Sequence, residues 1–459
     1  MYKNTNEEID LSLENEDFFR KYNRKKIVAA ATLGCKVNQY DTEVVINAFR
    51  KEGYEIGDFE DYADIYIINT CTVTSLGDRK SRQMIRRARN RNPGSIIAVI
   101  GCYAQASPEE ASSIEGVDLV AGTKDRTKIV EYVRNIEKER KQLVKVENIM
   151  NARDFENAGI DSYTEHTRAY IKIQEGCTQF CAYCIIPYVR GPVRSKPAPD
   201  VQEEVLRLSR AGYKEIVLTG IHLASYGRDL KNTSLTDIIH RIHDLDGIER
   251  IRLGSLEPTF ISSDFVNFVI EHEKLCPHFH ISLQNGCDAT LKRMNRKYTT
   301  SEYRQAVELI KGKIKDASIT TDVMVGFPGE TDEEFSQTVE FLKGLPLSKM
   351  HIFKYSRRKG TPAAEFKNQI PAEEKEHRSK ILLELSQEKS YEFERSFEGR
   401  VMPVLFEQNV KENENLMEGL TPNYIRVQCP GNNKLKGEIA DVKILQALNG
   451  YVTGEILQV

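Results

Sequence analysis

The sequence has no long apolar run, no recognisable leader and little net charge. No stretch of the 459-residue chain approaches the roughly 20 apolar residues of a membrane helix, so we expect no membrane association. The start, MYKNTNEEID, lacks the basic and then apolar order of a signal peptide, which predicts a cytoplasmic protein. The net charge of −3 excludes a globally basic surface, so any RNA must bind at local patches.

A fourth cysteine is missing from a loop that has three. The segment EGCTQFCAYC places Cys177, Cys181 and Cys184, the loop triad, at C-x3-C-x2-C spacing. Three thiolates can hold three irons of a cubane iron–sulfur cluster and leave the fourth iron open to a substrate or cofactor. A structural zinc site is the alternative, but it normally has four ligands, and neither His166 nor His222 is at zinc spacing. In a reducing compartment, nine cysteines indicate metal binding or catalysis and not disulfides.

Apolar strands alternate with helical segments after residue 25. Strands are expected at 26–35, 63–71, 95–102 and 117–122, and helices at 38–52, 78–91 and 123–145. Strands that are apolar on both faces and alternate with helices predict a doubly wound parallel sheet in an α/β domain.

Three further cysteines stand at the carboxyl ends of the first three expected strands. These are Cys35, Cys71 and Cys102, the strand-end triad. The carboxyl ends of parallel strands share one edge of the sheet, so we expect the three side chains to converge and hold a second cluster. The alternative is that each is a small buried packing residue, which is common for free cysteine.

The expected helix at 78–91 carries seven basic residues and one acidic residue. They are Arg79, Lys80, Arg82, Arg86, Arg87, Arg89 and Arg91, with Asp78. A charge run of this kind is either an ordinary solvated face or a surface that contacts RNA phosphates.

A longer βα series follows, and then a region of short strands. Strands are expected before the loop triad and at 215–222, 249–257, 278–286, 318–329 and 349–356. Six βα units predict a partial (βα)6 barrel, with its chemistry at the carboxyl ends of the strands. The short strands after residue 399 predict a small OB-like β-barrel. The expected boundaries are a flexible extension at 1–24 with a short helix around Phe18 and Phe19, an N-terminal domain at 25–140, a linker at 141–165, a barrel core at 166–393 and a C-terminal barrel at 394–459.

Several ordered motifs resemble those of the radical S-adenosylmethionine methylthiotransferases. TLGCKVNQYDTE, NTCTVT and GCYAQ are similar to the N-terminal cluster motifs of that family. CIIPYVRGPVRS, LQNGCD, MNRKYT and VGFPGET are similar to its barrel motifs, and EGLTPNYIRV is similar to its TRAM module. The forms GCKVNQYDTE and NTCTVT most resemble the branch that modifies threonylcarbamoyladenosine in tRNA. The branches that act on isopentenyladenosine in tRNA and on a ribosomal-protein aspartate remain alternatives.

The resemblance implies a radical enzyme with two 4Fe–4S clusters and two molecules of S-adenosylmethionine. The loop triad would hold the cluster that binds and reductively cleaves S-adenosylmethionine, and the strand-end triad would hold the cluster that carries the inserted sulfur. The expected reaction adds a methylthio group at carbon 2 of the modified adenosine at position 37, in the tRNA anticodon loop. Catalysis would belong to the cofactors, so no catalytic side chain is assigned. The alternative to an enzyme is a non-catalytic iron–sulfur protein that binds RNA.

The resemblance also implies contacts to S-adenosylmethionine and a source of electrons. Tyr183, inside the cysteine loop, is expected to meet the adenine, and Gly220, Ser255 and Glu257 are candidates for the amino and ribose contacts. The expected partners are the tRNA anticodon loop and a reductant such as flavodoxin or ferredoxin. The sequence does not identify the sulfur donor.

Overall fold

The computed structural model describes residues 9–73, 75–161, 163 and 167–458, and the chain divides into two compact units. The N-terminal unit comprises Met1–Ser162, Glu175–Thr178 and Cys184–Pro192. The core unit comprises Tyr163–Gln174, Gln179–Tyr183 and Val193–Val459. The cysteine loop therefore contributes to both units, with Cys181 in the core unit.

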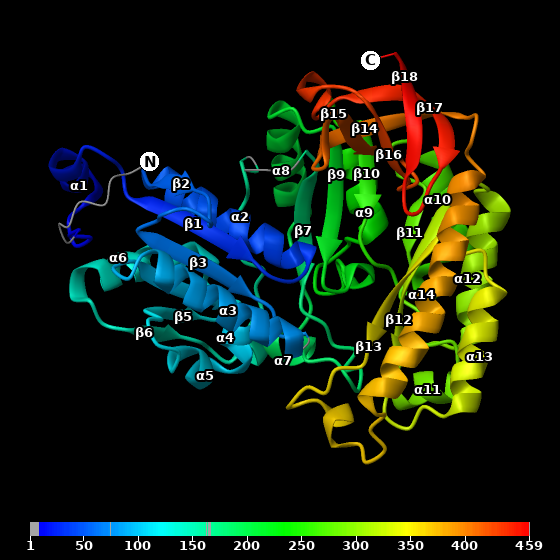
Figure 1. The fold of residues 1–459 in the computed structure, drawn as a ribbon, viewed down its shortest axis with the longest axis horizontal. Coiled ribbons are helices and arrows are strands. Elements are labelled where there is room, and N and C mark those ends of the chain that lie inside the picture. The colour runs from blue at the N-terminus through cyan, green and yellow to red at the C-terminus, as the bar shows by residue number, and fades with distance from the viewer. Residues whose placement is uncertain (1–8, 74, 162, 164–166, 459) are drawn as a thin grey trace. The chain divides into compact units, whose positions relative to one another are not determined.

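The N-terminal unit is built on a parallel sheet of six strands in the order β2-β1-β3-β4-β5-β6 (Figure 1). The strands are β1 (Ile27–Thr32), β2 (Glu55–Gly57), β3 (Ile65–Thr70), β4 (Ile96–Gly101), β5 (Leu119–Ala121) and β6 (Leu143–Lys145). Every residue of β3 and β4 is buried, as expected for central strands that helices cover on both faces.

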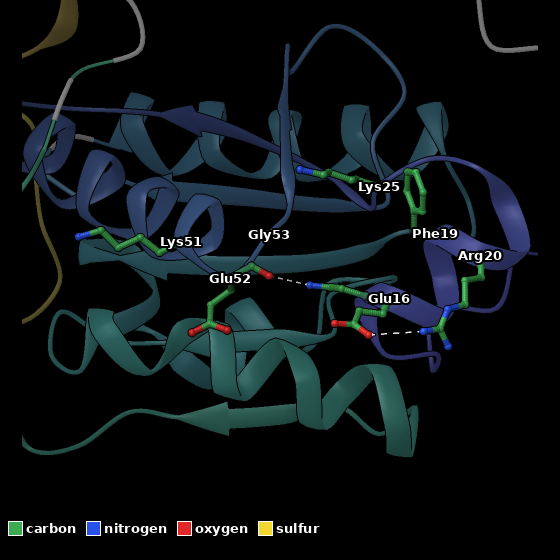
Figure 2. A pocket seen from close by; sticks show the side chains of 8 residues that line it. Glu16, Phe19, Arg20, Lys25, Lys51, Glu52 and Gly53 are labelled. Atoms are coloured by element: carbon green, nitrogen blue, oxygen red, sulfur yellow. Dashed lines mark hydrogen bonds and ion pairs between the residues drawn. The ribbon is translucent and has the colours of Figure 1, made fainter.

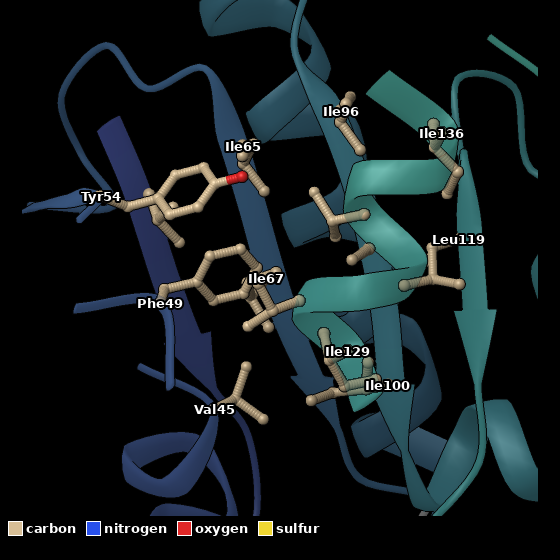
Figure 3. Close-up of a cluster of buried hydrophobic side chains, with 14 of the residues drawn as sticks. Val45, Phe49, Tyr54, Ile65, Ile67, Ile96, Ile100, Leu119, Ile129 and Ile136 are labelled. Atoms are coloured by element: carbon tan, nitrogen blue, oxygen red, sulfur yellow. The ribbon is translucent and has the colours of Figure 1, made fainter. Parts of the chain in front are cut away.

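Helices pack on both faces of this sheet, which confirms the predicted doubly wound fold. The helices are α2 (Lys36–Lys51), α3 (Ser75–Arg91), α4 (Cys102–Ala106), α5 (Pro108–Ser112) and α6 (Ile129–Glu139), with the 3-10 turns η1 (Arg126–Lys128) and η2 (Ile149–Asn151). Figure 3 shows Phe49 of α2 and Ile136 of α6 in one apolar cluster with Ile67 of β3. A second cluster contains Ile85 of α3 and Ala104 of α4.

The helix predicted over 123–145 is shorter than expected. It ends at Glu139, where Arg140 adopts a left-handed conformation (φ 52°), and Leu143–Lys145 then forms β6 beside β5. The other edge strand, β2, also has only three residues. Strands of this length carry too little alternation to be recognised in the sequence.

Part of the N-terminal extension is packed against the sheet domain. Helix α1 (Asn15–Tyr22) buries Phe18 completely in the same apolar cluster as Phe49, and Leu11 joins it. Acidic residues in the first turn and basic residues in the last turn complement the helix dipole. The short helix expected around Phe18 is present, but its attachment was not predicted, because the polar composition of the extension hides anchors such as Leu11 and Phe18. Residues 1–8 lie outside the described residues.

A surface depression of about 640 Å³ lies beside α1 (Figure 2). Its lining combines α1 side chains such as Phe19 and Arg20 with Lys51 and Glu52 at the end of α2. Its lining includes no cysteine and no predicted cofactor contact.

The core unit contains the six predicted parallel strands, which confirms the partial barrel. They are β7 (Ala169–Glu175), β9 (Glu215–Gly220), β10 (Arg250–Leu253), β11 (His278–His280), β12 (Ser318–Val325) and β13 (Lys349–Lys354), with the short β8 (Arg194–Ser195) beside β7. The sheets β10-β9-β7-β8 and β11-β12-β13 are joined by parallel bridges such as Ile251–Leu275.

Helices connect these strands, and several begin with reciprocal caps. They are α8 (Ala198–Arg210), α9 (Leu235–His243), α10 (Ser263–Glu271), α11 (Asp288–Arg293), α12 (Thr300–Lys313), α13 (Asp332–Lys343) and α14 (Ala372–Arg395), with η3 (Leu223–Ser225), η4 (Pro258–Phe260) and η5 (Pro362–Glu365). Thr299 and Glu302 form such a capping box at α12. Helix α7 (Ile186–Arg190) belongs to the N-terminal unit. Among the described residues, no helix is long and apolar enough to cross a membrane.

The C-terminal strands close into the predicted small barrel, in the order β14-β15-β16-β18-β17. They are β14 (Val401–Val410), β15 (Asn413–Leu420), β16 (Arg426–Pro430), β17 (Ile439–Ala447) and β18 (Val452–Gln458), with η6 (Asn433–Leu435). Arg250 and Arg252 of β10 donate to carbonyl oxygens of the barrel, and the Tyr424 ring stacks on His278 with 4.5 Å between centroids. The small barrel thus contacts β10 and the first residue of β11.

Candidate functional site: two cysteine triads

The strand-end triad occupies the carboxyl ends of three neighbouring strands. Cys35 follows β1 and precedes α2, Cys71 directly follows β3, and Cys102 directly follows β4. Because β1, β3 and β4 are adjacent in the sheet, the three loops lie side by side, as predicted.

Two glycines bring these loops into close approach. Gly34 has a φ of +107°, and a Cβ added there would lie 3.1 Å from the Cys71 Sγ. Gly101 has a φ of +95°, and a Cβ there would lie 2.2 Å from Asn69 Oδ1 and 2.7 Å from the Thr70 carbonyl oxygen. Only glycine combines the left-handed conformation with this lack of space.

The strand-end thiols fit a cluster as ligands. All nine cysteines of the chain are free. Burial raises the pKa of Cys71 to about 11, and the neighbouring Cys102 and Cys35 add to the rise. A bound cation cluster would supply the positive charge that these thiols need to ionise.

The described residues contain no group of three or more His, Cys, Asp or Glu side chains that could hold a single metal ion. A cubane cluster binds each cysteine sulfur to a different iron and therefore spaces the sulfurs more widely than one ion does. The donor set of three free thiols matches a cluster better than a zinc ion, which would also require a fourth ligand.

A buried arginine contacts the sulfur of Cys102. Arg190, at the end of α7, donates from Nε to Cys102 Sγ at 3.3 Å and from Nη1 to Asp41 and Glu175, both at 2.6 Å. Its Nη2 donates to Asn38 Oδ1. All of these residues belong to the N-terminal unit. Burial opposes the charged form of Arg190, but Cys102 and the two carboxylates outweigh it and hold the pKa well above its usual range.

A second buried arginine completes this network. Arg126 binds Asp41 Oδ1 at 2.9 Å, Glu175 Oε1 at 2.6 Å and Glu156 Oε2 at 2.8 Å. Two arginines and three carboxylates are thus interlocked beneath Cys102, and each carboxylate is paired, as burial of charge demands.

The cysteine loop itself depends on one glycine and on backbone contacts within each unit. In the N-terminal unit, Cys177 N donates to Gly191 O at 3.0 Å, and a Cβ on Gly176 would lie 1.8 Å from the Pro192 carbonyl oxygen. In the core unit, Ala182 N donates to Met294 O at 2.9 Å.

An arginine whose side chain is 7% exposed contacts the sulfur of Cys181. Arg296 Nη1 donates to Cys181 Sγ at 3.2 Å, and its Nη2 donates to both oxygens of Glu257 at 2.9 and 2.8 Å. The Nε of Arg296 donates to the Tyr298 hydroxyl at 3.0 Å. Burial raises the pKa of Glu257, but His222 and Arg296 outweigh burial and leave it below its usual range.

The four predicted S-adenosylmethionine contacts all belong to the core unit. Gly220 ends β9, and Ser255 and Glu257 follow β10, the neighbouring strand. Of these, Glu257 is tied to Cys181 through Arg296, and Ser255 is exposed. The Tyr183 ring meets Phe327 edge-on, with 6.4 Å between centroids.

Sequence reasoning did not single out Arg190, Arg296, Asn38 or Asp41. The two arginines stand in the motifs CIIPYVRGPVRS and MNRKYT, which were noted only for their resemblance. A signal existed for the others, because Asn38 and Asp41 follow Cys35 at the three-residue spacing that shares one helix face.

The basic helix α3 divides into paired and unpaired residues. Arg87 and Arg91 both bind Glu60, Arg89 binds Asp118 at 3.1 Å, and Arg82 binds Glu110 at 3.0 Å. Three basic residues are exposed and form no ion pair with any residue that the structure describes: Arg79, Lys80 and Arg86.

Family models match three successive parts of the chain. The model described as uncharacterized protein family UPF0004 matches residues 27–122, that of the radical SAM superfamily matches 171–342, and that of the TRAM domain matches 395–457.

Curated relatives match almost the whole length. The chain is 43% identical to the threonylcarbamoyladenosine tRNA methylthiotransferase MtaB of Bacillus subtilis, over 94% of this chain and 96% of the relative. It is 41% identical to the protein of the same name from Aquifex aeolicus, over 91% and 100%. It is 35% identical to the tRNA-2-methylthio-N(6)-dimethylallyladenosine synthase of Clostridium tetani, over 94% and 97%.

Among solved structures, the chain resembles the radical S-adenosylmethionine methyltransferase TsrM from Kitasatospora setae. The TM-score is 0.55 at 15% identity, over 74% of this chain and 77% of that chain. At this identity the likeness establishes a shared fold alone.

Proposed function

Because the chain belongs to the radical S-adenosylmethionine methylthiotransferase family, we propose that it adds a methylthio group to carbon 2 of N6-threonylcarbamoyladenosine at position 37 of tRNA. The observation that carries the proposal is the 43% and 41% identity to two nearly full-length relatives that bear this activity in their names. The dimethylallyladenosine synthase from Clostridium tetani matches less closely, at 35%.

The two triads divide the cofactors between them in this proposal. When bound, 4Fe–4S clusters would supply the electron that cleaves S-adenosylmethionine at the loop triad and the site that carries sulfur at the strand-end triad. The thiols of both triads form no disulfide, and they stand at strand ends or in one loop, which supports these assignments. The protein's own task is to hold the thiolates, exclude water and orient the ligands.

Four residues of the core unit are proposed to orient S-adenosylmethionine. Gly220, Ser255 and Glu257 stand at the carboxyl ends of β9 and β10, where barrel enzymes bind their ligands. Tyr183 is proposed to contact the adenine. The pairing of Glu257 with Arg296 supports a fixed carboxylate at this edge, because a bidentate ion pair restricts both side chains.

The proposed macromolecular partner is the tRNA anticodon loop, whose unpaired bases can be splayed into a pocket. Arg79, Lys80 and Arg86 on α3 are proposed phosphate contacts, since their charges are not neutralised by other described residues. A cytoplasmic reductant such as flavodoxin or ferredoxin is proposed as the electron source. The predicted boundaries at residues 25, 141, 166 and 394 remain a proposal.

The proposal is tested by mass spectrometry of tRNA nucleosides from a strain that lacks the gene. Loss of methylthio-threonylcarbamoyladenosine, restored by the wild-type chain and not by Cys181→Ala, is the expected result. Loss of the methylthio-isopentenyl form instead would assign the chain to the other tRNA branch. Unchanged tRNA with an altered ribosomal-protein aspartate would exclude both tRNA branches.

A different measurement distinguishes the proposed enzyme from the alternative, a non-catalytic iron–sulfur RNA-binding protein. Such a protein would bind iron and tRNA but would form no 5′-deoxyadenosine from S-adenosylmethionine. Anaerobic reconstitution of the proposed enzyme should give about eight irons per chain and formation of 5′-deoxyadenosine once a reductant is added.

A further inference from the structure

Each cysteine triad contains one buried cysteine, and each buried cysteine accepts a hydrogen bond from an arginine whose side chain is largely shielded from solvent, 1% exposed in Arg190 and 7% in Arg296. Cys102 is 3% exposed and lies 3.3 Å from Arg190 Nε, whereas Cys181 is 7% exposed and lies 3.2 Å from Arg296 Nη1. The two contacts lie in different units and arise from different elements, so they are independent observations.

Carboxylates fix both arginines in place. Arg190 donates hydrogen bonds to Asp41 and Glu175, and Arg296 donates to both oxygens of Glu257. A guanidinium has five donors in a rigid plane, so carboxylates that bind some of these donors aim the remaining N–H in a set direction. In both arginines one of the remaining donors meets a cysteine sulfur, and another meets Asn38 Oδ1 in Arg190 and the Tyr298 hydroxyl in Arg296.

A charged donor on a thiolate has two consequences for a cluster that the thiolate would ligate. It stabilises the anionic sulfur and limits the movement of the ligand, because charge-assisted hydrogen bonds are strong and directional. Hydrogen bonds to cluster sulfurs and other outer contacts also set the reduction potential, because they favour the more negatively charged reduced state.

We propose that Arg190 and Arg296 are positioning residues, one for each cluster, that hold Cys102 and Cys181 and raise the reduction potential of their own cluster. This inference rests on the proposed assignment of the two triads as cluster ligands and does not depend on the tRNA substrate. It assigns each arginine to one cluster only, which makes the two roles separable.

The test measures potentials in chains that carry a single cluster. One background replaces the loop triad by alanine and retains the strand-end cluster, and the other replaces the strand-end triad and retains the loop cluster. Arg190→Lys and Arg296→Lys are introduced into each background, since lysine keeps the positive charge but lacks the planar set of donors that lets arginine contact a carboxylate and a sulfur together. Redox titration followed by electron paramagnetic resonance gives the midpoint potential, and iron analysis gives occupancy.

Arg190→Lys should lower the potential or the iron content of the strand-end cluster and leave the loop cluster unchanged. Arg296→Lys should do the reverse. The proposal would be overturned by a variant that changes the potential or iron content of both clusters alike, or of neither cluster. With Arg190 present, the resonance Raman Fe–S(Cys) band of the strand-end cluster should shift when H2O is replaced by D2O. The size of this shift should be smaller in Arg190→Lys.

Arg378→Lys serves as the matched control in both backgrounds. Arg378 is a buried arginine of the core unit that binds Glu330 at 2.8 Å, Asp332 at 2.7 Å and Glu374 at 2.7 Å, with no sulfur among these partners. Its variant should preserve both potentials and both iron contents. If it changes them as Arg190→Lys and Arg296→Lys do, the effect is general destabilisation and the proposal fails. Altered potentials in these variants, together with no methylthiolated tRNA from the wild-type chain that carries both clusters, would instead contradict only the proposed function.

Discussion

The N-terminal unit and the core unit surround their buried cysteines differently. Beneath Cys102, Arg190 and Arg126 share Asp41 and Glu175 in a closed network. Beside Cys181, Arg296 pairs with one carboxylate among the described residues, Glu257. His222 Nε2 lies 3.5 Å from the same carboxylate.

This difference indicates a division of labour between the two sites. A deeply buried cation is stable only when its charge is matched on several sides, which the network beneath Cys102 achieves without a ligand. The pair beside Cys181 stands among strand ends where Ser255 is exposed, so polar groups there are available to a small molecule. Under the proposed assignment, the first site would keep its cluster fixed and the second would admit a cofactor.

The largest effect is expected from removal of the Cys181 thiol in the core unit. Cys181→Ala should abolish 5′-deoxyadenosine formation and reduce iron from about eight to about four per chain, because one cluster loses a ligand. Liquid chromatography of the reaction mixture and iron analysis measure both quantities. Cys429→Ala, at a buried cysteine of the C-terminal barrel, is the control and should retain both. Persistence of 5′-deoxyadenosine in Cys181→Ala would show that the loop triad is wrongly assigned.

The second-largest effect is expected when the strand-end triad is disrupted by a substitution at a glycine and not at a cysteine. Gly101→Ala adds a Cβ 2.2 Å from Asn69 Oδ1 at a φ of +95°, which should displace the Cys102 loop. We expect loss of about half of the iron and retention of 5′-deoxyadenosine formation. The control is Gly53→Ala, which has a similar φ of +85° but nothing within 4 Å of the added Cβ. Equal iron loss in both variants would argue against a role for the close approach.

A third prediction concerns the stability of the N-terminal unit. Phe18→Ala should lower the free energy of unfolding by about 3–5 kcal/mol, because the side chain is completely buried. Phe19→Ala, at a side chain that is 49% exposed, should change it by roughly 0.5 kcal/mol or less. Chemical denaturation of the apoprotein measures both values. A small effect of Phe18→Ala would mean that α1 does not pack on the sheet in solution.

The smallest effect is a pH dependence in the core unit. Burial raises the pKa of Glu394 from 4.5 to about 7, against the opposing effect of Lys349. Between these two pH values the folded state binds more protons than the unfolded state, so this carboxyl reduces stability as the pH rises. Glu394→Gln should therefore stabilise the protein above pH 7 and lose that advantage below about pH 4.5. Thermal melts at several pH values measure this; a gain that is independent of pH would contradict the assignment.

Much of the architecture follows from the sequence because buried parallel strands are long and apolar. Residues 65–70 and 96–101 were recognised for this reason, and with them the placement of Cys71 and Cys102. The three-residue strands β2 and β6 escaped because so short a segment has no period. A short helix around Phe18 was expected, but its packing on the sheet was not, because buried apolar side chains such as Leu11 and Phe18 are few in this polar segment.

The family and its two-triad pattern could also be predicted, since cysteine spacing and strand ends are local properties. The arginines could not, because the partners of Arg190 are Asp41, Cys102 and Glu175, which are distant in sequence and meet only after folding. Pairing of charge with sulfur in the interior is a tertiary property that no single segment encodes.

The central claim, that two separate cluster sites perform different parts of one reaction, is tested most directly by Cys102→Ala. The anaerobically reconstituted variant is given S-adenosylmethionine, reductant and tRNA that carries threonylcarbamoyladenosine, and both 5′-deoxyadenosine and methylthiolated nucleoside are measured. The account predicts that 5′-deoxyadenosine still forms while the methylthio product is absent. Wild-type amounts of methylthio product, or loss of 5′-deoxyadenosine with the loop cluster still bound, would contradict it.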